Sequence, residues 1–537
     1  MGKAADIAKI SARGGFHLAW GLAASTIITS IGVIILARLL SPSDFGLYTI
    51  ALTIPNLIQY FRDWGTSYAT VKYSAYYKSK DNYLKVKEII FSGLIFQAVL
   101  SIVLTLITFL LSDFLAITVF QRPSIVHLIQ VVSLSLLSSA FVTLVQTKAG
   151  ISTSAAQAAF IGLEKTEYNS LVLLILSIIR TILTSTFVIV GLGAFGATIG
   201  YSLSLVLAGA TSLLLILIIF KELPKSSFKE IKLIENLKFM FRYGFPLSVV
   251  SIVRGFTLQF YLVLLAIYAS DQLIGNYSVA TNFVVLITFL AVPIVTILYP
   301  AFSKLDAKND WQDLRSVFRF SVKYGSLLVI PATFLVIGLS EPIIYTIFGS
   351  QYDSSPLFLS LLAITYLLSA FGFLTVNNFL NGQGQTVLNM KLTLLSSLIG
   401  LPLGYFLISY FEVLGLIVAM FVAEIPSLVI GLYWIWRNYG FSIDWTSSFK
   451  ILFSSGIGAI LAFFVVSSIG FVDWVNLLVG LFVFVGLFLL VSLLIRVVDR
   501  DDLGNLRDMT RGLGSLYRVL VLFFDFYERL IVVFKLE

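Results

Sequence analysis

Charged side chains inside long apolar stretches are the part of this sequence that could do chemistry. Five bases and two acids stand at such positions: Arg62, Lys148, Arg180, Arg242, Arg254, Asp63 and Glu424. An ionised side chain at the centre of a lipid bilayer costs about 2.5–3.5 kcal/mol on insertion scales, so each of them needs a partner or a function. The excess of base over acid favours an anionic ligand, because guanidinium groups bind phosphate oxygens through paired hydrogen bonds.

Arg180 and Arg254 fall near the middle of their apolar stretches, too far from either end to reach the membrane surface easily. Polar residues accompany the bases at helical spacing, as Gln59 and Asp63 do in the second stretch, and this spacing places them on one helix face. Hydroxyl and amide groups beside cations suit a phosphate that carries sugars. The substrate-binding residues that we predict are Arg62, Lys148, Arg180, Arg254 and Gln59.

A structural interpretation of the same charges stays open. Arg62 can pair with the adjacent Asp63, Arg180 can pair with Glu424, and stripes of serine and threonine can pack helices closely without any ligand. Asp63 and Glu424 are therefore candidates either for coupling to H⁺ or Na⁺ or for ion pairs.

Metal and thiol chemistry are not expected, and we predict no cofactor. The sequence contains no cysteine, which excludes disulfides and thiolate nucleophiles. Its two histidines, His17 and His127, are too few for a histidine-based metal centre.

The composition predicts a membrane protein over the whole length of 537 residues. Hydrophobic residues make up 58% of the chain and charged residues 12%, whereas soluble domains carry about 25% charged residues. A soluble enzyme with one anchor is thereby excluded. The net charge of +8 is better explained by cytoplasmic loops than by a nucleic-acid partner, which we do not expect.

Fourteen apolar stretches are long enough to cross a bilayer, because a spanning helix needs about 20 residues. They lie near residues 15–39, 45–70, 86–112, 124–147, 168–192, 195–220, 239–268, 273–299, 316–340, 356–380, 387–410, 413–436, 448–470 and 474–496. Most basic residues fall in alternate loops and in the two tails, and the opposite loops hold only Arg38 and Arg122. This bias predicts a multi-pass cell-membrane protein with 14 transmembrane helices and both termini in the cytoplasm.

A weak internal repeat divides the first twelve stretches into two halves. Phe45-Gly-Leu-Tyr48 returns as Ile274-Gly-Asn-Tyr277, 229 positions later, and Gly162 returns as Gly382. Six spans per copy make the repeat parallel, and such carriers bind their substrates near the membrane midplane between two lobes. The predicted units are an N-terminal lobe (1–222), a C-terminal lobe (223–440), two further spans (441–498) and a cytoplasmic amphipathic tail (499–537).

Three segments then show a family resemblance. Residues 32–48 resemble the first-loop signature of the polysaccharide transporter family, and residues 62–65 and 273–280 are similar to two further segments of it. These proteins are the oligosaccharide flippases of the multidrug/oligosaccharidyl-lipid/polysaccharide (MOP) exporter superfamily. The resemblance implies an all-α membrane protein with two six-helix lobes in a V and two extra C-terminal helices. It also implies alternating-access transport of a polyprenyl-(pyro)phosphate-linked oligosaccharide to the outer leaflet, for surface polysaccharide or glycan biosynthesis.

Two other functions are weighed against a flippase. An ion-coupled multidrug-type antiporter of the same superfamily would favour an acidic cavity for cationic drugs, whereas the charges inside the spans are mainly basic. A membrane enzyme of glycan assembly would need a large external loop, and the longest predicted one is residues 112–123. We therefore predict a monomeric flippase that is not an enzyme, with membrane lipids and a lipid-linked oligosaccharide as partners.

Overall fold

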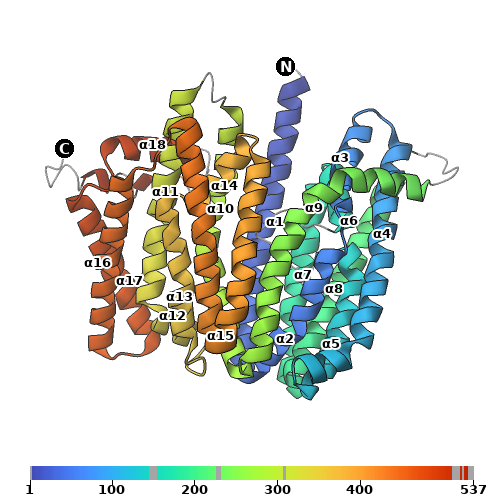
Figure 1. The fold of residues 1–537 in the computed structure, drawn as a ribbon, viewed down its shortest axis with the longest axis horizontal. Helices are drawn as coiled ribbons and strands as arrows, with labels where there is room; N and C mark the ends of the chain where they lie inside the picture. The colour runs from blue at the N-terminus through green and yellow to red at the C-terminus, as the bar shows by residue number, and fades with distance from the viewer. Residues whose placement is uncertain are drawn as a thin grey trace. The chain divides into compact units, whose positions relative to one another are not determined.

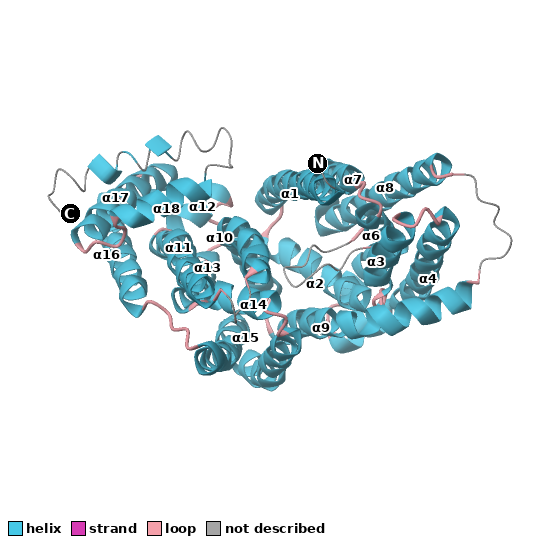
Figure 2. Ribbon diagram, turned by 90° about the horizontal axis from the view of Figure 1, so that it is seen from above, coloured by secondary structure: helices cyan, strands magenta, loops and turns pink. Residues whose placement is uncertain are grey.

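Helices are the regular elements of the part of the chain that the computed structural model describes (Figures 1 and 2). That part comprises residues 3–143, 154–224, 232–305 and 310–510, together with positions 521, 522, 525 and 527–529. No strand occurs within these ranges, in agreement with the predicted all-α fold class.

The helices follow one another along the chain, interrupted by short 3₁₀ or π segments that are labelled η. The first half contains α1 (Lys3–Leu39), α2 (Pro42–Ile58), η1 (Gln59–Phe61), α3 (Thr66–Lys78), α4 (Tyr83–Leu110), η2 (Phe114–Val119), η3 (Pro123–Ile125), α5 (Val126–Ser133), η4 (Leu134–Ala140), α6 (Ala155–Gly162), α7 (Thr166–Phe187), η5 (Val188–Leu192) and α8 (Gly193–Glu222). The second half contains α9 (Leu233–Tyr268), α10 (Asp271–Lys304), α11 (Trp311–Gly338), α12 (Ser340–Ile347), α13 (Ser355–Leu367), η6 (Leu368–Phe371), α14 (Phe373–Gly382), α15 (Thr386–Tyr439), α16 (Trp445–Ile469), α17 (Asp473–Leu494) and α18 (Arg500–Thr510).

Many of these helices are suited to cross a membrane. Among the described residues, nine helical segments are long and apolar enough, or ten if α14 is counted with α13 and η6 as one bent span. The chain is therefore a multi-pass membrane protein. Two of the nine segments, α7–α8 and α15, contain hairpins, because contacts join their two arms: Gly200 packs against Thr184, and Gly415 packs against Leu407. The total of fourteen spans stays a prediction.

Two compact units divide the chain. The first comprises residues 1–279 and 393–423, and the second comprises residues 280–392 and 424–537. The first unit thus contains α9 and the beginning of α10, which the internal repeat assigns to the C-terminal lobe. The lobe boundaries at 222 and 440 remain a proposal based on the repeat.

The internal repeat is visible as a reciprocal contact within the first unit, between the starts of α2 and α10. A methyl group added to Gly46 would lie 1.9 Å from the carbonyl oxygen of Asp271, and one added to Gly275 would lie 1.9 Å from that of Pro42. The members of each equivalent pair are 229 positions apart, as are Thr49 and Ser278, whose hydroxyl groups are hydrogen-bonded at 2.9 Å. Contacts that repeat with their roles exchanged are the signature of a two-fold axis between the two segments.

The second predicted span is not one continuous helix, contrary to the expectation for residues 45–70. It consists of α2, η1 and α3, and the chain turns at Trp64 (φ 47°) and Gly65 (φ 86°) before α3 begins. Gly65 meets the backbone of Gly244 in α9, where a methyl group at position 65 would lie 2.1 Å from the carbonyl carbon. The left-handed backbone and this close approach both favour glycine.

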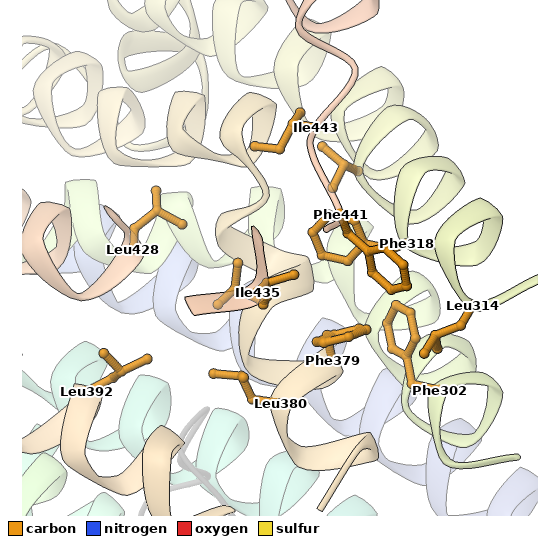
Figure 3. Packing of buried hydrophobic residues seen from close by; sticks show 12 residues of the cluster. Phe302, Leu314, Phe318, Phe379, Leu380, Leu392, Leu428, Ile435, Phe441 and Ile443 are labelled. Carbon is orange, nitrogen blue, oxygen red and sulfur yellow. The ribbon is translucent and has the colours of Figure 1, made fainter. Parts of the chain in front are cut away.

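The second unit has a core of interlocked aromatic rings (Figure 3). Phe379 of α14 meets Phe302, Phe318 and Phe441 with ring centroids 5.3, 5.4 and 6.0 Å apart, each in an edge-to-face arrangement. Such edge-to-face pairs are the favoured aromatic geometry and add stability beyond the buried area. This core fastens α10, α11, α14 and the segment after α15 together.

The chain after α17 folds back on the second unit. Asp502 of α18 is buried and pairs with Lys323 of α11 at 2.5 Å, and Arg507 pairs with Asp525 and Glu528 at 2.6 and 2.5 Å. Tyr527, which falls within the predicted amphipathic tail, is only 3% exposed and packs among the side chains of α11, α16 and α17. Most of residues 511–537 lie outside the described part of the chain.

Candidate substrate-binding site

Arg180 lies deep in the first unit, as its place in the sequence predicts. It stands 14 residues after the start of α7 and 12 residues before Leu192, the end of η5, which corresponds to about 18–21 Å of helix on either side. An arginine side chain cannot cover that distance to reach a membrane surface. Arg180 is therefore a cation at mid-membrane depth.

The guanidinium group of Arg180 packs against an aromatic ring, and two of its nitrogen atoms lack a hydrogen-bond partner among the described residues. Its central carbon lies 4.6 Å from the ring centre of Tyr201 in α8, and that ring meets Tyr48 of α2 edge to face, with centroids 6.4 Å apart. Its Nε and Nη2 atoms are buried and have no hydrogen-bond partner among the described residues. A cation with buried, unsatisfied donors is costly and attracts an anionic group.

Arg254 is the second deep base, in α9 about 21 Å of helix from the end at Tyr268. Its side chain is half-buried, and no ion pair or hydrogen bond joins it to another described residue. The next residue, Gly255, packs directly against the ring of the buried Tyr60, which fixes the position of α9 beside η1. Arg254 thus has the depth and the open bonding capacity predicted for a ligand-binding base.

Arg62 is held in a different way. It is 1% exposed, and its Nη1 donates to the main-chain carbonyl of Ser139 in η4. The hydroxyl of Ser139 lies 2.8 Å from that of Ser101 in α4, which continues the polar contacts between the helices. These bonds place Arg62 at the junction of the broken span, where it holds α4, η4 and the turn before α3 together.

Asp63 joins the same polar junction. Its Oδ1 accepts hydrogen bonds from the Thr66 hydroxyl, the Ser67 main-chain N–H and Gln97 Nε2, each at 2.8 Å. Gln97 in turn accepts from the Ala155 main-chain N–H at 2.9 Å and so connects α3 with α6. The carboxylate of Asp63 therefore caps the start of α3 and satisfies buried donors.

The other candidate residues have weak contacts, are known only by their burial, or lie outside the described part of the chain. Gln59 is buried in η1, with Nε2 3.5 Å from Asn56 Oδ1, a distance at the limit of a hydrogen bond. Glu424 is half-buried in α15 and belongs to the second unit, and Arg242 is exposed in α9. Lys148 and the side chain of His17 lie outside the described residues.

A metal centre is not assembled in the part of the chain that the structure describes, where no group of three histidine or carboxylate ligands occurs. Two polar residues buried between helices, Gln97 and Gln157, were not predicted from the sequence. Tyr201 beside Arg180 was missed as well, and nothing in the sequence singles out that residue. Tyr48 could have been chosen, because it belongs to the repeated motif.

The fold and the deep arginines define a multi-pass membrane transporter. Within this class, the chain belongs to the polysaccharide biosynthesis protein family, whose model matches residues 11–306. A second family model, MatE, matches residues 246–406. Together these matches place the chain in the MOP exporter superfamily, in agreement with the resemblance seen in the sequence.

Two curated relatives carry related names. The chain is 24% identical over 261 residues to the probable low-salt glycan biosynthesis flippase Agl15 of Haloferax volcanii, a match that covers 48% of this chain and 54% of that protein. It is 24% identical over 391 residues to the lipopolysaccharide biosynthesis protein WzxC of Escherichia coli, covering 71% and 73% of the two chains. The chain thus spans about half the length of the first relative and nearly three quarters of the second.

Solved structures show the same fold at low sequence identity. A lipid II flippase MurJ in an inward closed conformation matches with a TM-score of 0.67 and 17% identity, over 88% of this chain and 98% of that one. An inward-facing multidrug resistance MATE transporter matches with a TM-score of 0.60 and 14% identity, over 78% and 94% of the chains. At these identities the likeness establishes the fold and leaves the cargo to be argued from the site.

Proposed function

We propose that this protein is a flippase that moves a polyprenyl-(pyro)phosphate-linked oligosaccharide from the cytoplasmic to the outer leaflet, for surface polysaccharide or glycan biosynthesis. The observation that supports this most directly is Arg180, a base at mid-membrane depth whose buried Nε and Nη2 lack partners among the described residues. A phosphate would satisfy these donors and neutralise the charge. Agl15 is named as a glycan biosynthesis flippase, which agrees with this choice of cargo.

In this proposal different side chains bind different parts of the substrate. Arg180 and Arg254 bind the phosphate groups, while hydroxyl and amide groups of neighbouring helices receive the sugars. The polyprenyl tail stays in the lipid, so only the polar head group crosses by alternating access. Arg62, Gln59 and Lys148 stay predicted binding residues, and the buried contacts of Arg62 favour a positioning role for it.

Several wider features belong to the same proposal. The protein would have fourteen transmembrane helices in two six-helix lobes plus two extra helices, and would lie in the cell membrane with both termini in the cytoplasm. It would act as a monomer, and H⁺ or Na⁺ could drive it, with Glu424 and Asp63 as the candidate coupling positions. No bond is made or broken in this cycle, and the chain is a transport protein rather than an enzyme.

An ion-coupled multidrug-type antiporter is the second candidate, because the MatE model matches residues 246–406. The charges oppose it. The two charges predicted near the middle of their spans, Arg180 and Arg254, are both basic, and a cationic drug would meet repulsion rather than a counter-ion there.

The test is a flipping assay with the full chain in proteoliposomes. A fluorescent polyprenyl diphosphate-linked oligosaccharide in one leaflet is followed by its loss of access to a membrane-impermeant quencher. We expect Arg180→Gln and Arg254→Gln to lower the rate about 10- to 100-fold, because a hydrogen bond to a charged group contributes about 1.5–3 kcal/mol.

Arg242→Gln is the matched control, since Arg242 is an exposed base of the same helix as Arg254, and its rate should stay near that of wild type. Wild-type rates in both deep-arginine variants, at normal protein levels, would remove the cavity assignment. A wild-type protein that moves cationic drugs but no lipid-linked sugar would favour the antiporter instead.

A further inference from the structure

A line of aromatic and basic side chains follows α3 at a strict step of four residues. We call this line the aromatic–lysine ladder, and its members are Trp64, Tyr68, Lys72, Tyr76 and Lys80. The first member precedes α3, and the last lies in the turn that leads to α4. Three members, Tyr68, Lys72 and Tyr76, lie on α3 itself. Each step of four residues turns the line by about 40° around the helix, so neighbouring members adjoin and the ladder forms a strip that winds around α3.

The ladder is open at the surface of the first unit. Tyr76 is 46% exposed and Trp64 is 42% exposed, while Lys72 and Lys80 are exposed and Tyr68 is half-buried. The other side of α3 packs against α4 and α6 and carries small polar residues that are fully buried: Thr66, Thr70 and Ser74. The ladder therefore lies on the side of α3 that borders α9, where the Tyr68 hydroxyl lies 3.2 Å from that of Ser251, and its outer members stay exposed.

The two lysines of the ladder rest on aromatic rings. Lys72 Nζ lies 3.8 Å from the ring centre of Tyr243 in α9 and 5.3 Å from that of Tyr73. Lys80 Nζ lies 4.5 Å from the ring centre of Tyr76 and donates to its hydroxyl at 2.6 Å. Cation–π contacts restrict the motion of both ammonium groups, and each group carries further donors for a ligand.

Rings of α9 widen the strip. Phe239 packs against Tyr73 with ring centroids 4.2 Å apart, and Phe245 stacks on Trp64 at 5.9 Å. Both phenylalanines keep at least 40% of their surface exposed. The result is an aromatic surface interrupted by positive charge, with no acidic residue on the ladder itself.

An interfacial aromatic belt does not account for this strip. A step of four residues rises about 6 Å, so the ladder covers about 18 Å between Tyr68 and Lys80. The headgroup layer on one side of a bilayer is only about 5–8 Å deep, and belt residues stay within it. The α3 helix lies at the end of the first unit where α1 begins (Figure 1), which is the cytoplasmic end in the proposed orientation. The ladder is thus long enough to reach beyond the headgroups.

We propose that the aromatic–lysine ladder is a cytoplasmic docking site for the glycan head group of the lipid-linked substrate, and that it prefers head groups with negative charge. Ring faces cover the apolar faces of sugars, while the ammonium groups pair with carboxylate or phosphate oxygens carried by the glycan itself. The site would hold the head group before it reaches the deep arginines. This inference rests on the proposed function and adds a second binding site to it.

Binding to the full-length protein in nanodiscs tests the proposal with three soluble probes. These are a short-chain polyprenyl diphosphate with an acidic oligosaccharide, the same lipid with a neutral oligosaccharide, and the diphosphate lipid without sugar. We expect Tyr76→Ala to weaken both sugar probes about tenfold, the size of one lost aromatic contact. Lys72→Gln should weaken the acidic-sugar probe about tenfold and leave the other two unchanged.

The controls are Tyr433→Ala in α15, which removes another exposed tyrosine (54%), and Lys221→Gln, which removes another exposed lysine of the first unit. Both should bind all three probes as wild type does. Unchanged binding of the acidic-sugar probe in both ladder variants overturns the proposal. An equal loss for the sugar-free lipid and for phosphatidylglycerol vesicles overturns it too, because the ladder would then be a surface for anionic lipid.

The outcomes also separate the ladder from the proposed function. If wild type flips the lipid-linked oligosaccharide and the ladder variants bind it normally, only the ladder proposal fails. If wild type neither binds nor flips any of the sugar-bearing probes, the proposed function fails with it. If the ladder acts as proposed, the ladder variants raise the half-saturating substrate concentration and leave the maximal flipping rate near wild type, whereas Arg180→Gln lowers that rate.

Discussion

Two substitutions of Asp63 distinguish a structural role of its carboxylate from a role in ion coupling. Its Oδ1 accepts from the Thr66 hydroxyl, the Ser67 N–H and Gln97 Nε2, all at 2.8 Å, and the residue is 7% exposed. Asp63→Ala removes the acceptor of the buried Ser67 N–H, whereas Gln97 Nε2 keeps the hydroxyls of Thr66 and Ser67 as acceptors at 2.9 and 3.0 Å. Asp63→Asn keeps an oxygen in place but cannot gain or lose a proton.

The expected losses of stability follow from these bonds. A buried donor without a partner costs about 1–3 kcal/mol, so Asp63→Ala, which removes the acceptor of one such donor, should lower the free energy of unfolding by about 1–3 kcal/mol. Asp63→Asn exchanges charge-assisted bonds for neutral ones, which are roughly half as strong, and should lose about 1–2 kcal/mol. If the role of Asp63 is structural, the Asn variant that folds should still transport.

The assay combines denaturant unfolding in detergent with flipping in proteoliposomes under H⁺ and Na⁺ gradients. Asp444 provides a matched control, because it also caps a helix, accepting from the Ser447 N–H at 3.2 Å and its hydroxyl at 2.6 Å. Asp444→Ala should cost about 1 kcal/mol, as a single exposed cap does. An Asp63→Asn protein with wild-type stability but no response to either gradient would refute the structural assignment and make Asp63 a coupling residue.

Three further predictions concern other parts of the chain. Gly46→Ala should lower the melting temperature strongly, since the added methyl group meets a carbonyl oxygen at 1.9 Å, whereas Gly486→Ala, with nothing within 4 Å, should not. Arg122→Gln should destabilise by about 1.5–3 kcal/mol in denaturant unfolding, because it removes the charge-assisted bond to the part-buried Asp271. Burial raises the pKa of Asp444, but bonds from Ser447 and nearby basic residues outweigh this and hold that pKa below its usual value. Stability should therefore fall as the pH drops below about 4, and Asp444→Asn should flatten this pH dependence of the melting temperature.

The helices could be located from the sequence because apolar length alone decides where a chain can cross a bilayer. The sequence repeat includes Gly46 and Gly275, and both positions need glycine because a carbonyl oxygen of the other segment approaches each of them closely. The same two residues therefore mark the repeat in the sequence and the contact in the fold. The depth of Arg180 followed from its distance to both ends of an apolar stretch. These features depend on local sequence and needed no knowledge of the packing.

Features that depend on distant partners could not be predicted. The turn at Trp64 and Gly65 exists beside Gly244, about 180 positions later, and an apolar stretch gives no sign of it. Tyr201 was overlooked beside Arg180 because aromatic residues are common in membrane helices. The burial of Tyr527 was missed because amphipathic spacing fits a lipid surface and a protein surface equally well.

The reciprocal contact between α2 and α10 is one that two identical chains could make. Pro42 meets Gly275 and Asp271 meets Gly46, so exchanging the two halves leaves the contact as it was. A half-length protein with a single such glycine would form it with a second copy of itself, one copy contributing each side of the axis. The crossing therefore has the geometry of an isologous interface, in which each side presents the same two groups to the other.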